Sequence, residues 1–379
     1  MKILHVCLSC FYIDSAGYQE NLLVKQNVSD GHDVLVIAST EIFTKEGSLT
    51  YTEPKKYVGS DGAVVIRIPY VKWLPHGIAR KLRIHNGLET LITEFEPDVI
   101  LFHGTTGNEI VTVSKYVKLH PEVIFYADCH EDFYNSARNI VSKYVLHGLF
   151  YRNRLKKALP QIRKIFCVNI EAIDYLRKMH GVTKDKIEFF PLGGFVLTEK
   201  EILTNRFAVR SKLGANRESF IFLQSGKMTP AKKLLLSLQS FTRLPGENLR
   251  FWIAGLLTDA VRTEIEDMIK SDARICFLGW QSTENLTKIM CAVDVYVQPG
   301  TQSASMQNAL CCGCPVIIYD YPGHVPYKEA GAIIVDHTEF PTAIANARFW
   351  NKDLKRKQAL EFASTHLDYG KQANRIMQP

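Results

Sequence analysis

The stretch Phe220–Lys233 reads FIFLQSGKMTPAKK and decides how the second half of the chain folds. Its start, residues 220–224, is a short run of large apolar side chains, as in a strand buried on both faces of a sheet. Gly226 follows as a point where the backbone can come close to a ligand, and three lysines precede an apolar helical pattern. A strand that leads directly into a helix predicts a crossover unit and a parallel sheet.

Similar apolar runs alternate with helical stretches on both sides of this segment. Downstream they lie at 250–254, 275–278, 293–298, 315–319 and 332–335, and upstream at 3–7, 33–38, 63–68, 98–103, 123–129, 165–168 and 187–190. Such alternation is typical of parallel sheets with helices on both faces. We therefore expect an α/β fold with two doubly wound, Rossmann-like sheets that face each other across a cleft.

The chain is long enough for two domains, each with its own core. We expect an N-terminal domain at 1–192 and a C-terminal domain at 193–352, because Pro191-Leu192-Gly193-Gly194 has the composition of a turn or hinge. After Val335 the sequence is helical without a further strand. Residues 353–379 are therefore expected to form terminal helices, which either close the second domain or cross back to the first.

Composition limits the classes of function. The net charge of +7 is spread along the chain, which gives only weak support to nucleic-acid binding and suits small anions or lipid head groups better.

Nine cysteines, an odd number, lie mostly in apolar runs, which favours reduced thiols. Cys7 and Cys10 form an isolated C-x-x-C without a second pair at zinc spacing. No export signal and no apolar run of membrane-spanning length is seen. We expect a cytoplasmic protein, with contact to the inner face of the plasma membrane left open.

Two strand ends in the second domain carry groups suited to an anionic ligand. Gly226, Lys227 and Lys232 would supply free amides and cations to a diphosphate, and lysines at the positive end of a helix are otherwise unfavourable. The segment Pro299–Val316 turns at Pro-Gly and enters a helix with Ser303 and Ser305 at its start. A solvated loop and ordinary helix capping are the alternatives, but the two strand ends belong to one domain, which favours a shared ligand site.

One strand end in the first domain is dense in ionisable groups. After the apolar run at 123–127 come Asp128, His130, Glu131 and Asp132. A buried structural strand has no use for this density, which is typical of functional sites. A metal pair is an alternative, although no third ligand lies at suitable spacing. His103, at the end of the neighbouring strand, is a weaker candidate and could be a core histidine.

Together these segments resemble the group 1 nucleotide-sugar transferases, glycosyltransferase family 4, over nearly the whole chain. Gly226-Lys227 with Lys232 is similar to the family's Gly-Arg-x-x-x-x-Lys motif, and Phe277-Leu278-Gly279 matches its Phe-Leu-Gly strand end. Residues 308–316, NALCCGCPV, follow its Glu-Ala-x-x-x-Gly-x-Pro-Val motif with asparagine in place of glutamate. The family's earlier glutamate falls on Gly300, and its double glycine after the first strand is reduced to Gly17.

The resemblance implies the GT-B fold and a set of site residues. Lys227 and Lys232 would act on the donor diphosphate as catalytic groups, together with His130 from the first domain. Donor-binding residues would be Gly17, Gly226, Trp280, Gln302, Ser303, Ser305 and Asn308, and acceptor-side residues would be Asp128, Glu131 and Asp132. Trp280 would approach the base through its backbone, and the residues from Gln302 to Asn308 would make neutral contacts to ribose and sugar.

The resemblance also implies the reaction. We expect a metal-independent, retaining hexosyltransferase that needs no cofactor. It would move a sugar from a nucleotide-diphosphate donor, UDP- or GDP-linked, to a saccharide or lipid-linked saccharide in cell-surface polysaccharide synthesis.

Basic stretches with aromatic residues at 71–83 and 149–157 suit an anionic membrane surface or a solvated helix face equally. Alternatives are a non-catalytic GT-B homologue that supports a partner enzyme, and a sugar-nucleotide epimerase. A dehydrogenase is disfavoured, because no Gly-x-Gly-x-x-Gly follows a strand.

Overall fold

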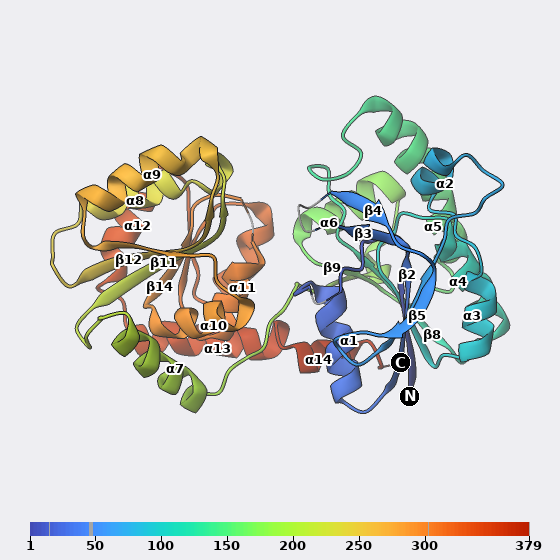
Figure 1. Cartoon of the computed structure of the whole chain (residues 1–379), viewed down its shortest axis with the longest axis horizontal. Coiled ribbons are helices and arrows are strands. Elements are labelled where there is room, and N and C mark those ends of the chain that lie inside the picture. The colour runs from blue at the N-terminus through green and yellow to red at the C-terminus, as the bar shows by residue number, and fades with distance from the viewer. Residues whose placement is uncertain (15, 45–47, 302, 379) are drawn as a thin grey trace. The chain divides into compact units, whose positions relative to one another are not determined.

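The computed structural model describes residues 1–378 except 15, 45–47 and 302. The chain divides into two compact units (Figure 1). The first comprises Met1–Pro191 and Tyr369–Pro379, and the second comprises Leu192–Asp368. The last helix of the chain, α14 (Tyr369–Arg375), belongs to the first unit, whereas α13 (Lys352–His366) belongs to the second. The terminal helices expected at 353–379 are divided between the units, because α13 packs on α11 (Ala304–Cys311) and α14 packs on α1 (Gln19–Ser29).

The first unit is built on an eight-stranded sheet in the order β10-β9-β8-β7-β1-β2-β6-β5, in which only β5 is antiparallel to its neighbour. The strands are β1 (Lys2–Cys7), β2 (Asp33–Ser39), β5 (Lys55–Val58), β6 (Val64–Ile68), β7 (Val99–Phe102), β8 (Ile124–Cys129), β9 (Ile165–Cys167) and β10 (Ile187–Phe189), with a separate hairpin of β3 (Glu41–Phe43) and β4 (Leu49–Tyr51). The remaining helices are α2 (His76–Leu82), α3 (Leu88–Phe95), α4 (Glu109–Leu119), η1 (Ser142–Tyr151), α5 (Arg152–Ala158), α6 (Ile170–Tyr175), η2 (Leu176–His180) and η3 (Lys184–Lys186).

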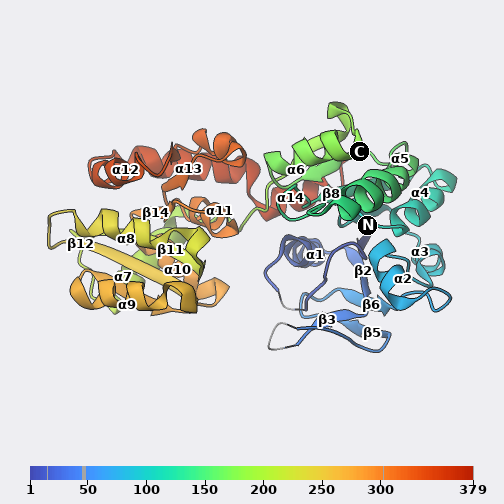
Figure 2. The same ribbon diagram turned by 90° about the horizontal axis from the view of Figure 1, so that it is seen from above.

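The second unit has six parallel strands in the order β13-β12-β11-β14-β15-β16. They are β11 (Phe220–Met228), β12 (Leu249–Leu257), β13 (Ile275–Gly279), β14 (Val295–Gln298), β15 (Val316–Tyr319) and β16 (Ile333–Val335). One face is covered by α8, α9 and α12 and the other by α7, α10, α11 and α13 (Figures 1 and 2). The bounds not yet given are α7 (Glu199–Lys212), η4 (Pro230–Lys232), α8 (Leu234–Thr242), α9 (Asp259–Ser271), α10 (Thr283–Ala292), η5 (Pro322–Lys328) and α12 (Phe340–Ala347).

The expected fold class, α/β with two doubly wound parallel sheets, is confirmed. In each sheet the chain runs outward in one direction from the first strand and then returns to its other side, so that β1 lies beside β7 and β11 lies beside β14. At such a switch point the loops after the two strands diverge and leave room for a ligand at the carboxyl edge. Both candidate sites of this protein lie at these two edges.

Two local features differ from the expectation. The short strands β3, β4 and β5 were not expected, because their residues are largely polar or exposed and carry no run of buried side chains. The strand β11 is also longer than expected and continues through Gly226 and Lys227 to Met228. It can do so because β12 extends equally far and pairs Gly255 with Gly226. The strand therefore ends beyond Gly226, and Lys227 lies within it rather than in the following loop.

Candidate active site

A pocket of about 230 Å³ lies at the carboxyl ends of β11, β12 and β13 in the second unit. It brings together two residues that the sequence predicted for donor binding, Gly226 and Trp280, and Lys227, which was predicted to act on the donor diphosphate. The Trp280 side chain is 68% exposed, and Lys227 is exposed as well. The other lining residues are Ala254, Gly255, Leu256, Gln281 and Leu286. The pocket thus offers an apolar wall, an indole ring and one ammonium group.

The floor of this pocket depends on a close approach of two glycines. Gly255 has φ of +135°, and a Cβ atom there would lie 1.9 Å from the carbonyl oxygen of Gly226. We expect Gly255→Ala to lower the free energy of unfolding by roughly 3 kcal/mol, because it combines backbone strain with a backbone clash. Urea denaturation checks this. Gly214→Ala is the control: its φ is +67° and nothing lies within 4 Å, so strain alone acts there. Equal losses in both variants would contradict the clash.

Lys232 lies apart from this pocket and contacts the segment that follows β14. Its ammonium group donates to the carbonyl oxygen of Thr301 at 3.3 Å, and the Thr301 amide donates to the carbonyl oxygen of Ala231 at 3.1 Å. Burial lowers the pKa of Lys232 below its ordinary value. The loops after β11 and β14 are therefore joined at the switch point, with a partly buried cation between them.

Gly300 is held in the same contact. A Cβ atom at this position would lie 2.2 Å from the carbonyl oxygen of Ala231 and 2.7 Å from the Cα atom of Lys232. Position 300, where the resemblance would place a glutamate, has no room for a side chain with the backbone in this arrangement. The absence of that carboxylate is thus tied to the way the two loops pack.

The helix α11 places the other predicted donor-binding residues. Ser303 is its N-cap and accepts a hydrogen bond from the Ser305 amide at 3.3 Å, so the capping role considered as an alternative is present. Asn308 lies in the same helix, and its Oδ1 atom would be 2.8 Å from a Cβ atom at Gly194. The Gly193 amide donates to Oε1 of the neighbouring Gln307 at 2.9 Å. Gln302 lies outside the described residues.

In the first unit, three residues from two neighbouring strand ends meet at the switch point. Asp128 is buried and accepts hydrogen bonds from Nδ1 of His103 and from the Gly104 amide, each at 2.6 Å. Nε2 of His130 lies 3.6 Å from Oδ1 of Asp128, the oxygen that also accepts from the Gly104 amide. The His130 side chain is 37% exposed. The weaker candidate His103 is therefore part of the cluster, and His130 is its solvent-facing end.

The cluster continues inward through a second histidine. Nε2 of His103 lies 3.0 Å from Nδ1 of His5, and Nε2 of His5 lies 3.0 Å from Oδ1 of Asn27. Because the Asn27 oxygen accepts, His5 must donate from Nε2 and, when neutral, accept at Nδ1. His103 then donates from both ring nitrogens and is an imidazolium. This charge is consistent with a buried ion pair with the Asp128 carboxylate.

The pKa directions agree with this assignment. Burial, together with the charge on His103, lowers the pKa of His5 to about 3. Burial opposes the charged form of His103, but Cys7 and Asp128 outweigh it and raise its pKa to about 10. For Asp128, burial is outweighed by the two histidines, which hold the carboxyl pKa well below its usual range. Burial is also the largest single effect on His130, but the charge and hydrogen bond of Asp128, with the charges of Glu20 and Glu131, together outweigh it and raise the His130 pKa.

The remaining predicted residues of this unit have local partners. Glu131 accepts from the Thr106 hydroxyl at 2.7 Å and from the His130 amide at 3.2 Å, so it supports the loop that carries His130. Asp132 accepts from the amides of Tyr134 and Asn135, which makes it a turn residue. Gly17 is exposed in the loop before α1.

Sequence reasoning missed His5, Asn27 and Glu20. Glu20 stands in the first turn of α1, and its charge contributes to the raised pKa of His130. The available signal was a histidine inside the apolar run at 3–7, where a buried ring needs a partner. That partner lies 98 residues away in the sequence, which no local pattern indicates.

Comparison with known families identifies the chain. The model of the glycosyl transferases group 1 matches residues 205–347, and the model of Glycosyltransferase Family 4 matches residues 22–193. The chain belongs to the group 1 glycosyltransferases of the GT-B type. No curated protein matches this sequence.

Solved structures share the fold of this glycosyltransferase at low identity. HepE from Anabaena, in complex with UDP, is 14% identical with a TM-score of 0.65, over 99% of this chain and 98% of that one. A glycosyltransferase from Rickettsia africae is 13% identical with a TM-score of 0.65, over 99% and 97%. WaaG, a glycosyltransferase involved in lipopolysaccharide biosynthesis, is 13% identical with a TM-score of 0.60, over 99% of both chains. These likenesses establish the GT-B fold.

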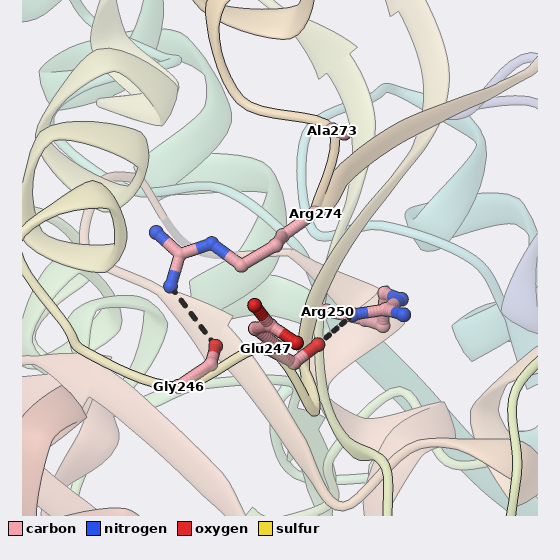
Figure 3. Close-up of a pocket in the computed structure, with 5 residues that line it drawn as sticks. All are labelled: Gly246, Glu247, Arg250, Ala273 and Arg274. Carbon is pink, nitrogen blue, oxygen red and sulfur yellow. Dashed lines mark hydrogen bonds between the residues drawn. The ribbon is translucent and has the colours of Figure 1, made fainter.

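A further pocket of the glycosyltransferase, of about 370 Å³, lies at the opposite, amino edge of the second sheet (Figure 3). The Arg274 guanidinium donates to the Gly246 carbonyl there, and the Arg250 guanidinium donates to the Glu247 carbonyl. Arg274 also forms an ion pair with the Asp272 carboxylate at 2.7 Å, so both cations already have local partners, and none of the predicted site residues lies there. Over the described residues, no group of three or more His, Cys, Asp or Glu is placed to hold a metal ion, and no helix is long and apolar enough to cross a membrane.

The buried histidines predict how the stability of this glycosyltransferase depends on pH. Burial lowers the pKa of His5, His85 and His180 to about 3, so below pH 6.5 the unfolded chain binds protons that the folded chain does not bind. The free energy of unfolding therefore falls as the pH falls below 6.5. His103 retains its proton when folded, and the stability that this gives is lost as pH rises from 6.5 toward 10. We expect the free energy of unfolding to peak near pH 6.5 and to fall on both sides, with limiting slopes of about 1.4 kcal/mol per pH unit for each group.

Urea denaturation between about pH 4 and pH 8.5 measures this profile. His103→Gln should reduce the decline on the alkaline side to the part that His130 contributes through its own raised pKa, and leave the acidic side in place. A profile that is flat from neutral to acidic pH would contradict the neutral state of the three buried rings.

Proposed function

We propose that this glycosyltransferase moves a hexose from a nucleotide-diphosphate donor to a hydroxyl group of a saccharide or lipid-linked saccharide, with retention at the anomeric carbon. The observation that carries the proposal is the pocket beside β11, β12 and β13, which places Trp280 together with Gly226 and Lys227. The pocket lies at the carboxyl edge of the sheet, the edge at which open parallel sheets bind their ligands. HepE, with the same fold, has been crystallised with UDP and with UDP-glucose, which favours a uridine or similar diphosphate donor.

Two lysines would stabilise the leaving diphosphate without a metal ion. Lys227 lines the pocket, and Lys232 is the last residue of η4, just before α8 and next to the loop after β14. Cations that are already in place where negative charge develops lower the barrier, because they need no reorganisation during the reaction. Ser303, Ser305 and Asn308 on α11 would make uncharged contacts to the ribose and the sugar.

His130 would act on the acceptor side. Its ring is half-exposed at the switch point of the first sheet, and Asp128 holds it from the buried side. A charged or hydrogen-bonded imidazole in this place can contact a sugar hydroxyl and orient it. We assign Asp128 and Glu131 to positioning His130 and its loop, and leave Asp132 as a turn residue with an acceptor-side location.

The biological setting that we propose is cell-surface polysaccharide synthesis at the cytoplasmic side of the membrane. WaaG, which has the same fold, is involved in lipopolysaccharide biosynthesis. A lipid-linked saccharide, one of the two acceptor classes that we propose, is held in a bilayer by its lipid. A peripheral location would bring the enzyme to an acceptor of this kind.

The test is binding and turnover of donors by the purified full chain. We expect a UDP- or GDP-sugar to raise the thermal midpoint, because a ligand that binds only the folded state stabilises it, by about 2.7 kcal/mol at 100 times its dissociation constant. Chromatography of the reaction mixture should show release of the nucleoside diphosphate with a saccharide acceptor. A chain that is shifted by no nucleotide would overturn the proposal.

One observation favours a second candidate, a non-catalytic homologue that binds a nucleotide or glycan for a partner enzyme. Gly300 leaves no room for a carboxylate beside Ala231, and Asn308 is uncharged. Such a homologue would show a thermal shift with donor but no release of diphosphate with any acceptor. Donor turnover at a rate above the uncatalysed reaction excludes it.

A further inference from the structure

An unpartnered apolar stripe runs along η1 and the residues just before it. Its side chains are between 58% and 77% exposed: Ile140, Val141, Tyr144, Val145 and Leu149. In a helix with i→i+5 hydrogen bonds, residues four and five apart lie on the same side, which joins these positions into one face. A contiguous exposed face of this kind on a protein surface marks an interaction site.

The opposite face of η1 already has its partners. His147 and Tyr151 are buried, and Nδ1 of His147 lies 2.5 Å from the Tyr175 hydroxyl. The helix continues directly into α5, where Leu155 and Ala158 enter the core of the first unit. The stripe is therefore not a displaced core face but the outer side of a helix that is already packed.

The charge around the stripe has one sign. Residues 133–157 contain six cations and no Asp or Glu: Arg138, Lys143, Arg152, Arg154, Lys156 and Lys157. In the part of the chain that the structure describes, none of the six is ion-paired with a carboxylate, and all but the partly buried Arg154 are exposed. The Lys143 ammonium lies 5.5 Å from the centre of the Tyr144 ring, beside the stripe.

We propose that this face, residues 138–157, docks the first unit onto an anionic lipid bilayer. Apolar side chains on a helix that lies in the interface enter the acyl boundary, while surrounding lysines and arginines bind anionic head groups. A bilayer supplies both kinds of partner over one continuous surface, since the acyl chains take up the apolar side chains and the anionic head groups pair with the cations. Of the two basic stretches in the sequence, 149–157 thus forms only the end of the docking face, which begins with Arg138.

The proposal deepens the proposed function, since a bilayer surface is where a lipid-linked acceptor is found. It is tested without donor or acceptor, so its failure is distinct from a failure of sugar transfer. The full chain is sedimented with vesicles of phosphatidylcholine alone or with about 30% phosphatidylglycerol. We expect binding to the anionic vesicles to be at least roughly tenfold tighter and to weaken with added salt.

Two exposed residues of the stripe give the decisive variant. Val145→Asp combined with Leu149→Asp should weaken binding to anionic vesicles by about tenfold or more, because it removes apolar contact and adds repulsion. The matched control is Leu203→Asp with Phe207→Asp, two exposed apolar residues on α7 in the second unit, which should bind as the unchanged chain does. Neither pair is buried, so both variants should keep the thermal midpoint and donor binding.

Several outcomes would overturn the proposal. They are equal binding to neutral and anionic vesicles, unchanged binding by the stripe variant, or loss of binding only in Trp73→Asp, a 73% exposed residue of the other basic stretch. A chain that leaves both kinds of vesicle unbound would also overturn it and would turn the search toward a protein partner.

Discussion

Lys232→Ala is expected to weaken binding of a nucleoside diphosphate by roughly 100-fold, since the loss of a partly buried cation that pairs with a phosphate costs about 2–5 kcal/mol. The ammonium group lies at the carboxyl edge beside β14, where it reaches the Thr301 carbonyl. Burial has already lowered its pKa, so an approaching diphosphate would meet a poorly solvated cation. Such a cation gains more from an anion than one in open water does.

Lys227→Ala should have a smaller effect, of roughly fivefold, because Lys227 is exposed and its charge is screened. Lys270→Ala is the control, as this lysine is 73% exposed on α9 and is not among the pocket residues. Calorimetric titration with UDP and GDP measures all three. If both Lys227→Ala and Lys232→Ala retained full donor affinity, the anion site would be misplaced.

Asp128→Asn is expected to lower the free energy of unfolding by roughly 3–5 kcal/mol, the usual cost of breaking a buried ion pair. The carboxylate accepts two hydrogen bonds at 2.6 Å, from His103 and from the Gly104 amide. An asparagine of the same shape leaves the buried imidazolium without a counter-charge. The pKa values of His103 and His130 should both fall, because Asp128 raises each of them.

A double variant separates lost charge from lost packing. If the cost arises from the unpaired imidazolium, His103→Gln in the Asp128→Asn background should recover part of the stability, and the two effects should not add. Asp132→Asn is the control, as its carboxylate serves a local turn. If Asp128 positions His130, the pH dependence of sugar transfer should shift to lower pH in Asp128→Asn, because His130 loses the carboxylate that raises its pKa. Additive losses and an unmoved pH profile would contradict the coupled cluster.

The sequence was sufficient for the architecture, because its signals are local. Runs such as 3–7 and 220–224 carry apolar side chains on both faces, and only a sheet covered by helices on both sides can bury them. The motif with Gly226, Lys227 and Trp280 could also be found, since each residue follows the end of a strand that the sequence predicts. The strands β3 to β5 could not, because β3 and β4 form a separate hairpin and β5 pairs at the sheet edge, and neither arrangement needs a buried run.

Only the tertiary structure decided which strand ends, distant in sequence, contact each other. The line from Asn27 through His5 and His103 to Asp128 and His130 joins α1, β1 and the ends of β7 and β8, and none of its spacings is periodic. The close approach of Gly300 to Ala231 is of the same kind. Sequence periodicity reports which face of an element is buried, but a hydrogen bond between loops depends on strand order and register. Those are properties of the assembled sheet.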